Sequence, residues 1–242
     1  MAETETAQTA RTETSTPSRS ARRPGAPRLD RRTRAARAQR REAREELLAA
    51  ALRVFARRGY QQAGVDEIAA EAGYSKGALY WHFPGKEELL VALLEERIDA
   101  PMREMVALLE SAPPDRDLAK EATREFARQL DEQREAILID REYWTLAIRD
   151  PELRASYTQR QADLRRSLAR AIEARASHLG THELPMPADW VARIVMSIIG
   201  GLAVDELAEP GSVSPGLLGD ALALIYAGLA ARAQEPTADR EV

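Results

Sequence analysis

Helical patterning dominates the sequence from about Arg40 to about residue 233. Apolar residues recur at intervals of three and four positions, and glycine and proline stand between the patterned segments. We find no run of alternating β-branched and aromatic residues bounded by turns, which is the pattern typical of strands. The sequence therefore predicts an all-α fold with about nine helices.

The same pattern sets the expected boundaries. The expected helices are Glu45–Arg58, Val65–Ala72, Ser75–Phe83, Lys86–Leu109, Leu118–Gln133, Glu135–Arg149, Pro151–Ser177, Ala188–Ala208 and Pro215–Arg232. Residues 40–85 should form a small helical domain and residues 86–233 a larger one. Residues 1–39 cannot bury enough apolar surface to offset their loss of entropy, so we expect a disordered, Arg-rich arm. Residues 234–242 are expected to be a disordered tail.

Composition excludes several classes of protein. The 242 residues include no cysteine, which rules out disulfide scaffolds, Cys-ligated metal sites and thiol nucleophiles. The longest uncharged apolar runs, 194–204 and 221–231, have eleven residues each and are too short to cross a bilayer. The first ten residues are polar and acidic, unlike a secretory signal. We therefore expect a cytoplasmic protein.

Charge is distributed unevenly along the chain. Residues 1–44 carry twelve arginines against five acidic residues, although the whole chain has a net charge of −4. A basic arm on an acidic body suggests a polyanionic partner at one end. The alternative is a solvated tail in which the arginines serve only to keep the chain soluble.

The segment from residue 65 to residue 83 carries the most specific signal. Two short helical patterns, Val65–Ala72 and Ser75–Phe83, are joined by a tight turn at Gly73, which is the helix-turn-helix pattern. The apolar positions expected to pack against the preceding helix are Ile68, Ala69, Leu79 and Phe83. That packing leaves the other face of the second helix exposed. By itself, the pattern is equally typical of a plain helical hairpin.

The start of the second helix is suited to close approach to DNA. Ser75 can cap it by accepting a hydrogen bond from the amide of Ala78 or Gly77. Gly77 and Ala78 present almost no side chain in the first turn, and a helix N-terminus favours a phosphate. The nearby side chains that can donate to phosphate oxygens are Lys76, Tyr80, His82 and Lys86. Phosphate contacts position such a helix, and its few groove-facing side chains specify sequence.

The stretch from Leu47 to Leu94 resembles the DNA-binding domain of the TetR family of bacterial transcriptional regulators. The likeness rests on the aromatic after Gly59, Val65-x-x-Ile68-Ala69, Ala72-Gly73-Tyr74-Ser75-Lys76-Gly77, Leu79-Tyr80-Trp81-His82-Phe83 and Lys86-x-x-Leu89. It implies a three-helix helix-turn-helix domain followed by a helical ligand-binding and dimerisation domain. It also implies a repressor that binds a palindromic operator as a homodimer and is released by a small-molecule effector.

The resemblance also implies roles for single residues. It places Lys76, Gly77 and Ala78 nearest the base edges. It places Tyr80, His82 and Lys86 on phosphates, with Ser75 as the cap. The family usually has Thr or Ser just before the position of Val65, whereas this chain has Ala63 and Gly64. A phosphate contact at Gly64 must therefore come from backbone amides. The arginines expected to add an accessory DNA contact from the arm are Arg28, Arg31, Arg32, Arg34 and Arg37, unless the arm is a bystander.

Two further sets of residues are expected in the larger domain. The aromatic and methionine side chains expected to line a pocket for a hydrophobic effector are Met102, Met105, Phe126, Tyr143, Trp144, Tyr157, Trp190 and Met196, with ordinary core packing as the alternative for each. The last two helices are apolar around more than one face, which predicts a dimeric four-helix bundle. The interface residues expected are Ile194, Ile198, Leu202, Leu218, Leu222, Ile225 and Leu229, unless one of these helices is central within a subunit.

Catalysis is not expected. No histidine lies near a plausible nucleophile, and no phosphate-binding glycine loop is present. His178 and His182 have a metal-ligand spacing, but Gly180 lies between them, so we expect a loop, no metal and no cofactor. The remaining alternatives are a transcriptional activator, or a helical enzyme or small-molecule-binding protein with a vestigial DNA-binding domain.

Overall fold

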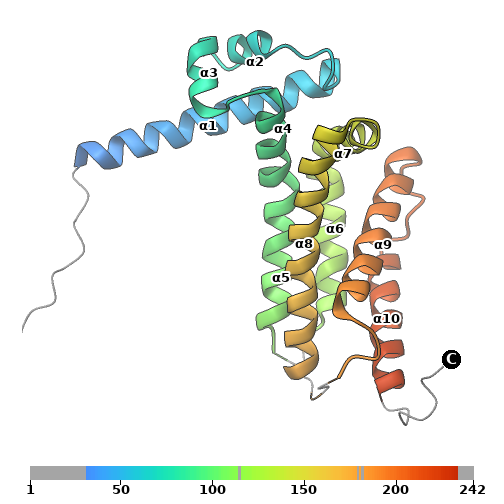
Figure 1. Cartoon of the computed structure of the whole chain (residues 1–242). Coiled ribbons are helices and arrows are strands. Elements are labelled where there is room, and N and C mark those ends of the chain that lie inside the picture. The colour runs from blue at the N-terminus through green and yellow to red at the C-terminus, as the bar shows by residue number, and fades with distance from the viewer. Residues whose placement is uncertain (1–30, 114–115, 179, 181–182, 234–242) are drawn as a thin grey trace, which may run out of the picture. The chain divides into compact units, whose positions relative to one another are not determined.

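A computed structural model describes residues 31–113, 116–178, 180 and 183–233. Every element in these residues is helical (Figure 1), so the all-α prediction is confirmed. The expected arm up to residue 30 and the expected tail at 234–242 lie outside the described residues. The described residues divide into two units, one up to Arg40 and one from Arg41 onward.

The helices follow the expected order. They are α1 (Arg31–Arg58), α2 (Val65–Glu71), α3 (Lys76–His82), α4 (Lys86–Leu94), a π-helical segment (Glu95–Asp99), α5 (Ala100–Ser111), α6 (Leu118–Glu132), α7 (Arg134–Ala147), α8 (Pro151–His178), α9 (Ala188–Ala208) and α10 (Leu217–Ala233). Because α4, the π segment and α5 run on without a break, the described residues form nine helical rods, as predicted.

The first helix begins earlier than expected. The sequence predicted disorder up to residue 39, whereas α1 already includes residues 31–39. The last proline of the arm is Pro27, and arginine and alanine, both strong helix formers, fill the first turns of α1. The residues from 32 to 40 are exposed, so helix propensity rather than burial accounts for this part of α1.

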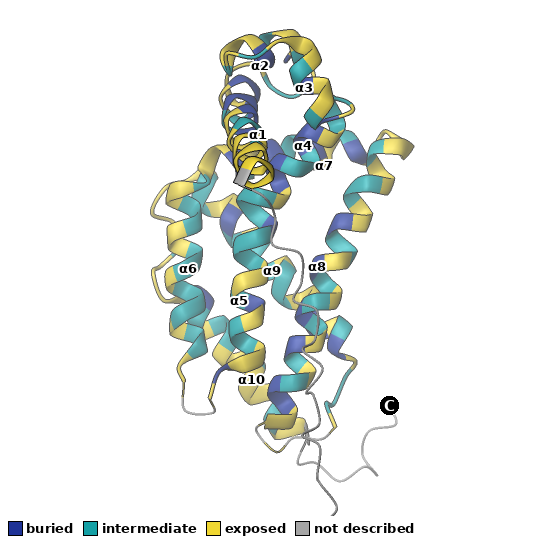
Figure 2. Ribbon diagram, turned by 90° about the vertical axis from the view of Figure 1, so that its left-hand side faces the viewer, coloured by how far each residue is buried: buried dark blue, intermediate teal, exposed yellow. Residues whose placement is uncertain are grey.

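The core of the helix-turn-helix region is buried from solvent. Leu48 and Phe55 of α1, Ile68 of α2 and Leu79 of α3 are all at most 1% exposed. In Figure 2, residues coloured as buried gather where these helices meet α4. The cluster continues past residue 85 into α4 and also includes Tyr143 of α7.

The helices beyond the π segment lie side by side (Figures 1 and 2), with α5 and α9 packed against α8 and α10 against α6. A smaller apolar cluster of Val106, Leu168, Ala171 and Ala192 joins α5, α8 and α9. None of the described helices is both long enough and apolar enough to cross a membrane.

A buried ion triad ties three of these elements together. Arg160 of α8 donates from Nε to Asp99 Oδ2 at 2.6 Å and from Nη1 to Asp140 Oδ1 at 2.7 Å. All three residues are less than 8% exposed. Burial raises the pKa of Asp99, and hydrogen bonding and attraction from Arg160 oppose the rise. The triad therefore joins the end of the π segment to α7 and α8.

Candidate nucleic-acid interface and effector cavity

The turn between α2 and α3 sets the direction of α3. Gly73 has φ of 78°, in the left-handed region that favours glycine. No atom lies within 4 Å of a Cβ built at Gly73, so conformation rather than space requires glycine here. Burial of Leu79 then fixes which face of α3 points outward.

Ser75 caps α3 as the sequence predicted. Its Oγ accepts a hydrogen bond from the backbone N of Ala78 at 3.1 Å. Lys76 and Gly77 are exposed and Ala78 is half-buried, so the first turn presents little bulk to solvent. Gly64 is the N-cap of α2 and is also exposed, and no side chain caps that helix.

Lys76 forms an ion pair within the helix-turn-helix region. Its Nζ lies 2.9 Å from Asp66 Oδ1 on α2. Hydrogen bonding to Asp66 raises the pKa of Lys76. Both side chains are more than half exposed, so water screens the pair and its contribution to stability is small. A phosphate or a base edge would have to compete with Asp66 for the ammonium group.

Lys86 is held at the start of α4. Its Nζ donates to the carbonyl O of Gln61 at 3.0 Å and lies 4.6 Å from the centroid of the Tyr60 ring. Desolvation lowers the pKa of Lys86, against a raising effect from Glu142. Lys86 is thus oriented by the loop that follows α1, rather than by α3.

Aromatic side chains cover the outer end of α3. Tyr80 is 43% exposed and Trp81 is 60% exposed. The half-buried His82 ring packs edge-on against Trp81, with 4.7 Å between the ring centroids. Trp81 was not among the residues expected to bind DNA. Its position two residues after the inward-facing Leu79 is the signal that could have identified it.

A second contact links α7 to the helix-turn-helix region. Both carboxylate oxygens of Glu142 lie 2.9 Å from the backbone N of Tyr60, which donates to them. Tyr143 is fully buried, and its hydroxyl lies 3.3 Å from both Glu87 Oε1 and the carbonyl O of Leu153. Burial raises the pKa of Tyr60 to about 12. Adjacent residues of α7 thus contact the loop after α1 and the first turn of α4.

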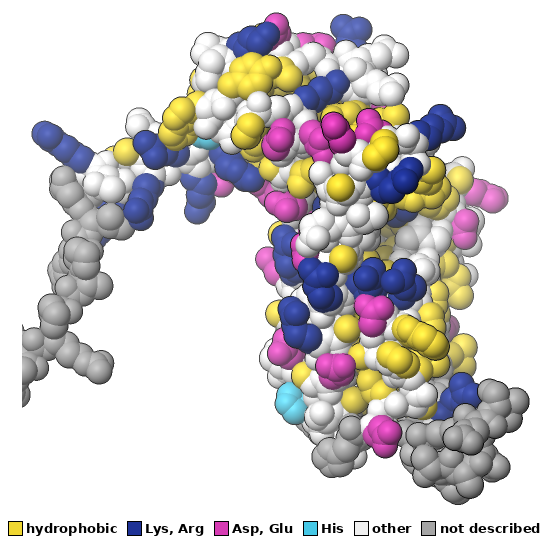
Figure 3. Space-filling view, in the orientation of Figure 1, with side chains coloured by type: hydrophobic (Ala, Val, Ile, Leu, Met, Phe, Trp, Pro, Cys, Tyr) yellow, Lys and Arg dark blue, Asp and Glu magenta, His cyan; other side chains and the backbone are white. Residues whose placement is uncertain are grey.

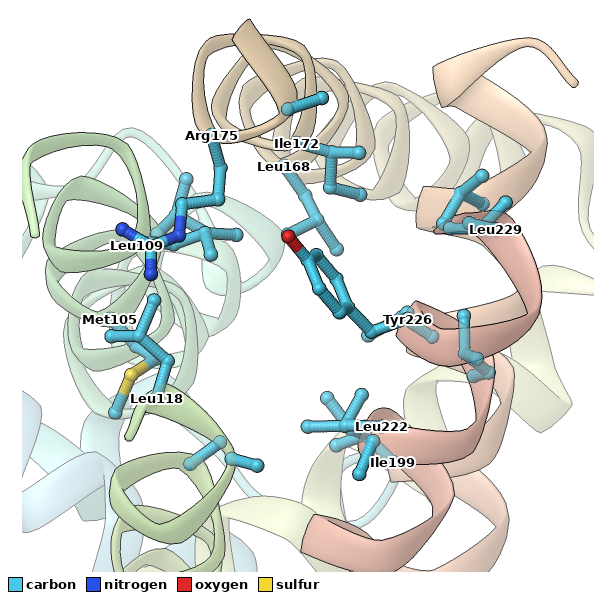
Figure 4. A pocket seen from close by; sticks show the side chains of 18 of the residues that line it. Met105, Leu109, Leu118, Leu168, Ile172, Arg175, Ile199, Leu222, Tyr226 and Leu229 are labelled. Carbon is cyan, nitrogen blue, oxygen red and sulfur yellow. The ribbon is translucent and has the colours of Figure 1, made fainter. Parts of the chain in front are cut away.

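A cavity of about 480 Å³ lies among the helices of the larger region, which is within the size range of small-molecule sites (Figure 4). It is lined mainly by aliphatic side chains from α5, α6, α8, α9 and α10. Three of the expected pocket residues line it, namely Met102, Met105 and Met196. Most of the lining was not predicted from the sequence, and it includes Leu109, Leu168, Ile172, Val195, Ile199 and Tyr226.

The other five expected pocket residues do not line this cavity. Tyr143 belongs to the core of the helix-turn-helix region, and Tyr157 packs on it with 5.8 Å between the ring centroids. Trp144 is 44% exposed and Trp190 is 61% exposed. Phe126 is half-buried on α6. Tyr226 is the one aromatic residue in the described lining, so aromatic residues as a set do not mark this cavity, and their role in effector binding stays a prediction.

The expected interface residues separate into two groups. Ile194 is 44% exposed, and Ile198 and Leu202 are partly exposed on α9. On α10, Leu218 is buried within one chain, and Leu222, Ile225 and Leu229 line the cavity instead. This face of α10 therefore borders the cavity within one chain, and its place in a dimer interface stays a prediction. The exposed apolar stripe, as we call it below, consists of Trp190, Ile194, Val204, Leu217 and Leu224.

His178 and His182 are the two histidines whose spacing suits metal ligands. His178 is the last residue of α8, and His182 lies outside the described residues. Within the described residues, no three His, Asp or Glu side chains are grouped so that they could hold a metal ion. An exposed, Ser75-capped α3 and a ligand-sized cavity in the same chain define an all-helical protein with a helix-turn-helix region.

Comparison with known proteins narrows this class to one family. Residues 47–93 match the family described as "Bacterial regulatory proteins, tetR family", and residues 114–231 match "BetI-type transcriptional repressor, C-terminal". The chain belongs to the TetR family of bacterial transcriptional regulators, which are not enzymes.

Individual relatives match over different lengths. The transcriptional activator FasR of Mycolicibacterium smegmatis is 54% identical over 54 residues, which are 22% of this chain and 25% of FasR. The match thus spans about a quarter of the length of FasR. The transcriptional repressor AcnR of Corynebacterium diphtheriae is 28% identical over 169 residues, which are 69% of this chain and 82% of AcnR.

A solved structure shows the same fold. A transcriptional regulator from Saccharomonospora viridis in complex with choline has a TM-score of 0.57 and 23% identity to this chain. The superposition covers 77% of this chain and 96% of that chain.

Proposed function

We propose that this protein regulates transcription in the cytoplasm by binding a palindromic DNA operator as a homodimer. The observation that carries the proposal is the exposed N-terminal face of α3, where the Ser75 cap leaves Lys76, Gly77 and Tyr80 at the surface. A helix held in this way presents small and donating groups to the major groove. Gly64, Ala78, His82 and Lys86 complete the proposed DNA-binding set, to which we add Trp81.

The operator is tested by selection from random DNA duplexes. Two recognition helices in a symmetric dimer should select an inverted repeat with half-sites about 34–36 Å apart, or a multiple of that distance. Footprinting on the selected sequence should then protect both half-sites. Failure to enrich any repeat would contradict the proposal.

The exposed apolar stripe supports the homodimer. A single chain leaves large apolar side chains of α9 and α10 in water, and Leu224 is 74% exposed. Pairing of α9 and α10 with the same helices of a second copy would bury them in a four-helix bundle. Sedimentation at micromolar concentration measures the mass directly, and a monomer would contradict this part of the proposal.

We also propose repression that a hydrophobic small molecule relieves. The cavity supports an effector, because it has ligand size and a mostly apolar lining. An effector that prefers one conformation of the α7 and α8 region would change the position of α3, and effector and operator would be coupled. Transcription in vitro from a promoter that contains the selected operator should fall when the protein is added. A rise would indicate an activator.

A small-molecule-binding protein with no DNA function is the second candidate. The cavity is the observation that favours it. The two candidates are distinguished by the operator selection, since a binding protein with a vestigial helix-turn-helix would enrich no sequence.

A further inference from the structure

Few polar side chains line the cavity. Of its described lining residues, four have polar side chains, namely Arg116, Asp117, Arg175 and Tyr226. Arg175 alone among them is buried, at 7% exposure. A molecule inside this cavity therefore meets an apolar wall and one buried guanidinium group.

The neighbours of Arg175 fix its position. Its Nη1 donates to the carbonyl O of Ala112 at 2.6 Å and to that of Pro113 at 3.0 Å. These carbonyls lie at the C-terminus of α5, where the negative end of the helix dipole favours a cation. The guanidinium group is thus anchored before any ligand enters.

Tyr226 of α10 adds a hydroxyl group that points toward α8, the helix that carries Arg175. Figure 4 shows it extending from α10 into the open space of the cavity, with its oxygen toward the helix that carries Leu168, Ile172 and Arg175. The side chain is 50% exposed, so it lies at the rim of the cavity. A ligand oxygen that lies between α8 and α10 could accept from this hydroxyl.

The other two polar residues, Arg116 and Asp117, also have partners within the chain. Arg116 donates from Nε to Glu121 Oε1 at 2.6 Å, and Asp117 Oδ1 caps α6 by accepting from the backbone N of Lys120 at 3.0 Å. Both residues are exposed. The carboxylate of Asp117 is therefore not a buried counter-charge for a cationic ligand.

We propose that the effector is an amphipathic molecule with an apolar body and one acidic head group, which Arg175 and Tyr226 bind. A buried carboxylate needs a cation and hydrogen-bond donors to offset its desolvation, and this pair supplies both. An organic cation would meet Arg175 and would lack an aromatic cage, since Tyr226 is the one aromatic residue in the described lining. The inference rests on the proposed function only in naming the bound molecule as the effector.

Three probes with the same ten-carbon chain test the head group on the full-length protein. They are decanoate, 1-decanol and decyltrimethylammonium, and binding is measured by calorimetric titration. Decanoate should bind most tightly, decanol more weakly, and the cation not at all. If decyltrimethylammonium binds as tightly as decanoate, or if no monocarboxylate from six to fourteen carbons binds, the inference is wrong.

Variants test the two residues. Arg175→Met should weaken decanoate binding about 10- to 100-fold, the effect of losing a hydrogen bond to a charged group, and should leave decanol binding nearly unchanged. Arg170→Met is the matched control, because Arg170 is an exposed arginine of the same helix that does not line the cavity. Tyr226→Phe should weaken decanoate binding about 2- to 10-fold.

Folding and function are controlled separately. If Arg175→Met unfolds, because Ala112 and Pro113 lose their donor, Arg175→Lys keeps the charge and should retain more affinity for decanoate than for the cation. Unchanged decanoate binding in both Arg175→Lys and Tyr226→Phe would overturn the inference. Operator binding without any response to a carboxylate would remove this inference and leave the DNA-binding proposal intact. Carboxylate binding by a protein that selects no operator would contradict the DNA-binding proposal and leave this inference intact.

Discussion

At the scale of single residues, we expect opposite changes in operator affinity when the two partners of the Lys76–Asp66 ion pair are replaced. Lys76→Ala should weaken operator binding and change the preferred base, by about 1–3 kcal/mol if Lys76 reads a guanine. Asp66→Asn should instead strengthen binding, because it removes the carboxylate that competes for the ammonium group at 2.9 Å. Titrations on the selected operator and on single-base variants measure both effects.

The control for this pair is an ion pair between α1 and α2. Arg53 Nε lies 2.9 Å from Glu71 Oε1, and neither residue is in the proposed DNA-binding set. Arg53→Ala should leave the base preference unchanged. If Lys76→Ala weakens binding equally at every sequence, Lys76 contacts phosphate rather than bases.

At the scale of elements, the N-terminal part of α1 is a basic helix. Five of the ten residues from 31 to 40 are arginine, and Figure 3 shows basic side chains along it. Replacement of Arg32, Arg34 and Arg37 by Gln keeps helix propensity and removes charge. If these residues neutralise phosphates, the slope of log affinity against log salt should fall by about 0.9 for each phosphate that is no longer neutralised. Equal slopes for both proteins would show that this helix does not contact DNA.

The exposed apolar stripe allows a prediction about the oligomeric state. Leu224→Glu should convert the dimer to a monomer at micromolar concentration, because it places a charge on the side chain with the highest exposed fraction in the stripe. The fold of each chain should survive, since Leu224 packs little within its own chain. Leu138→Glu on α7, where the leucine is 48% exposed, is the control and should remain dimeric in sedimentation. A dimeric Leu224→Glu variant would place the interface elsewhere.

The elements also show what could be predicted from sequence. The helix Ala188–Ala208 was predicted with its observed bounds, since Pro187 precedes it and the apolar period is clear. The orientation of α10 could not be predicted, because Leu217 and Leu218 are chemically equal and only packing against α6 and the cavity distinguishes them. The cavity lining was missed for a similar reason. Aliphatic residues such as Leu168 and Ile172 serve a pocket and a packed core equally well.

At the scale of the whole molecule, the triad of Arg160, Asp99 and Asp140 should contribute more to folding than any surface pair. Arg160→Met leaves two buried carboxylates without their cation, so the free energy of unfolding should fall by about 3–5 kcal/mol. Arg165→Met on the same helix removes a more exposed pair, in which Arg165 Nε lies 2.6 Å from Asp189, and should cost about 1 kcal/mol or less. Urea unfolding of both variants gives the comparison, and similar losses would contradict it.

The π segment has a consequence for which changes of chain length the fold can accept. Each hydrogen-bonded turn in Glu95–Asp99 holds one residue more than an α-helical turn, whereas each residue of a regular α-helix advances about 100° around the axis. Loss of one residue here, such as Arg97, would turn the segment into plain α-helix. The core face of α4 and the cavity face of α5 would stay in register. The same deletion within α5 would rotate Met105 and Leu109 away from the cavity. Relatives that are one residue shorter in this part of the chain should therefore lack a residue between positions 95 and 99.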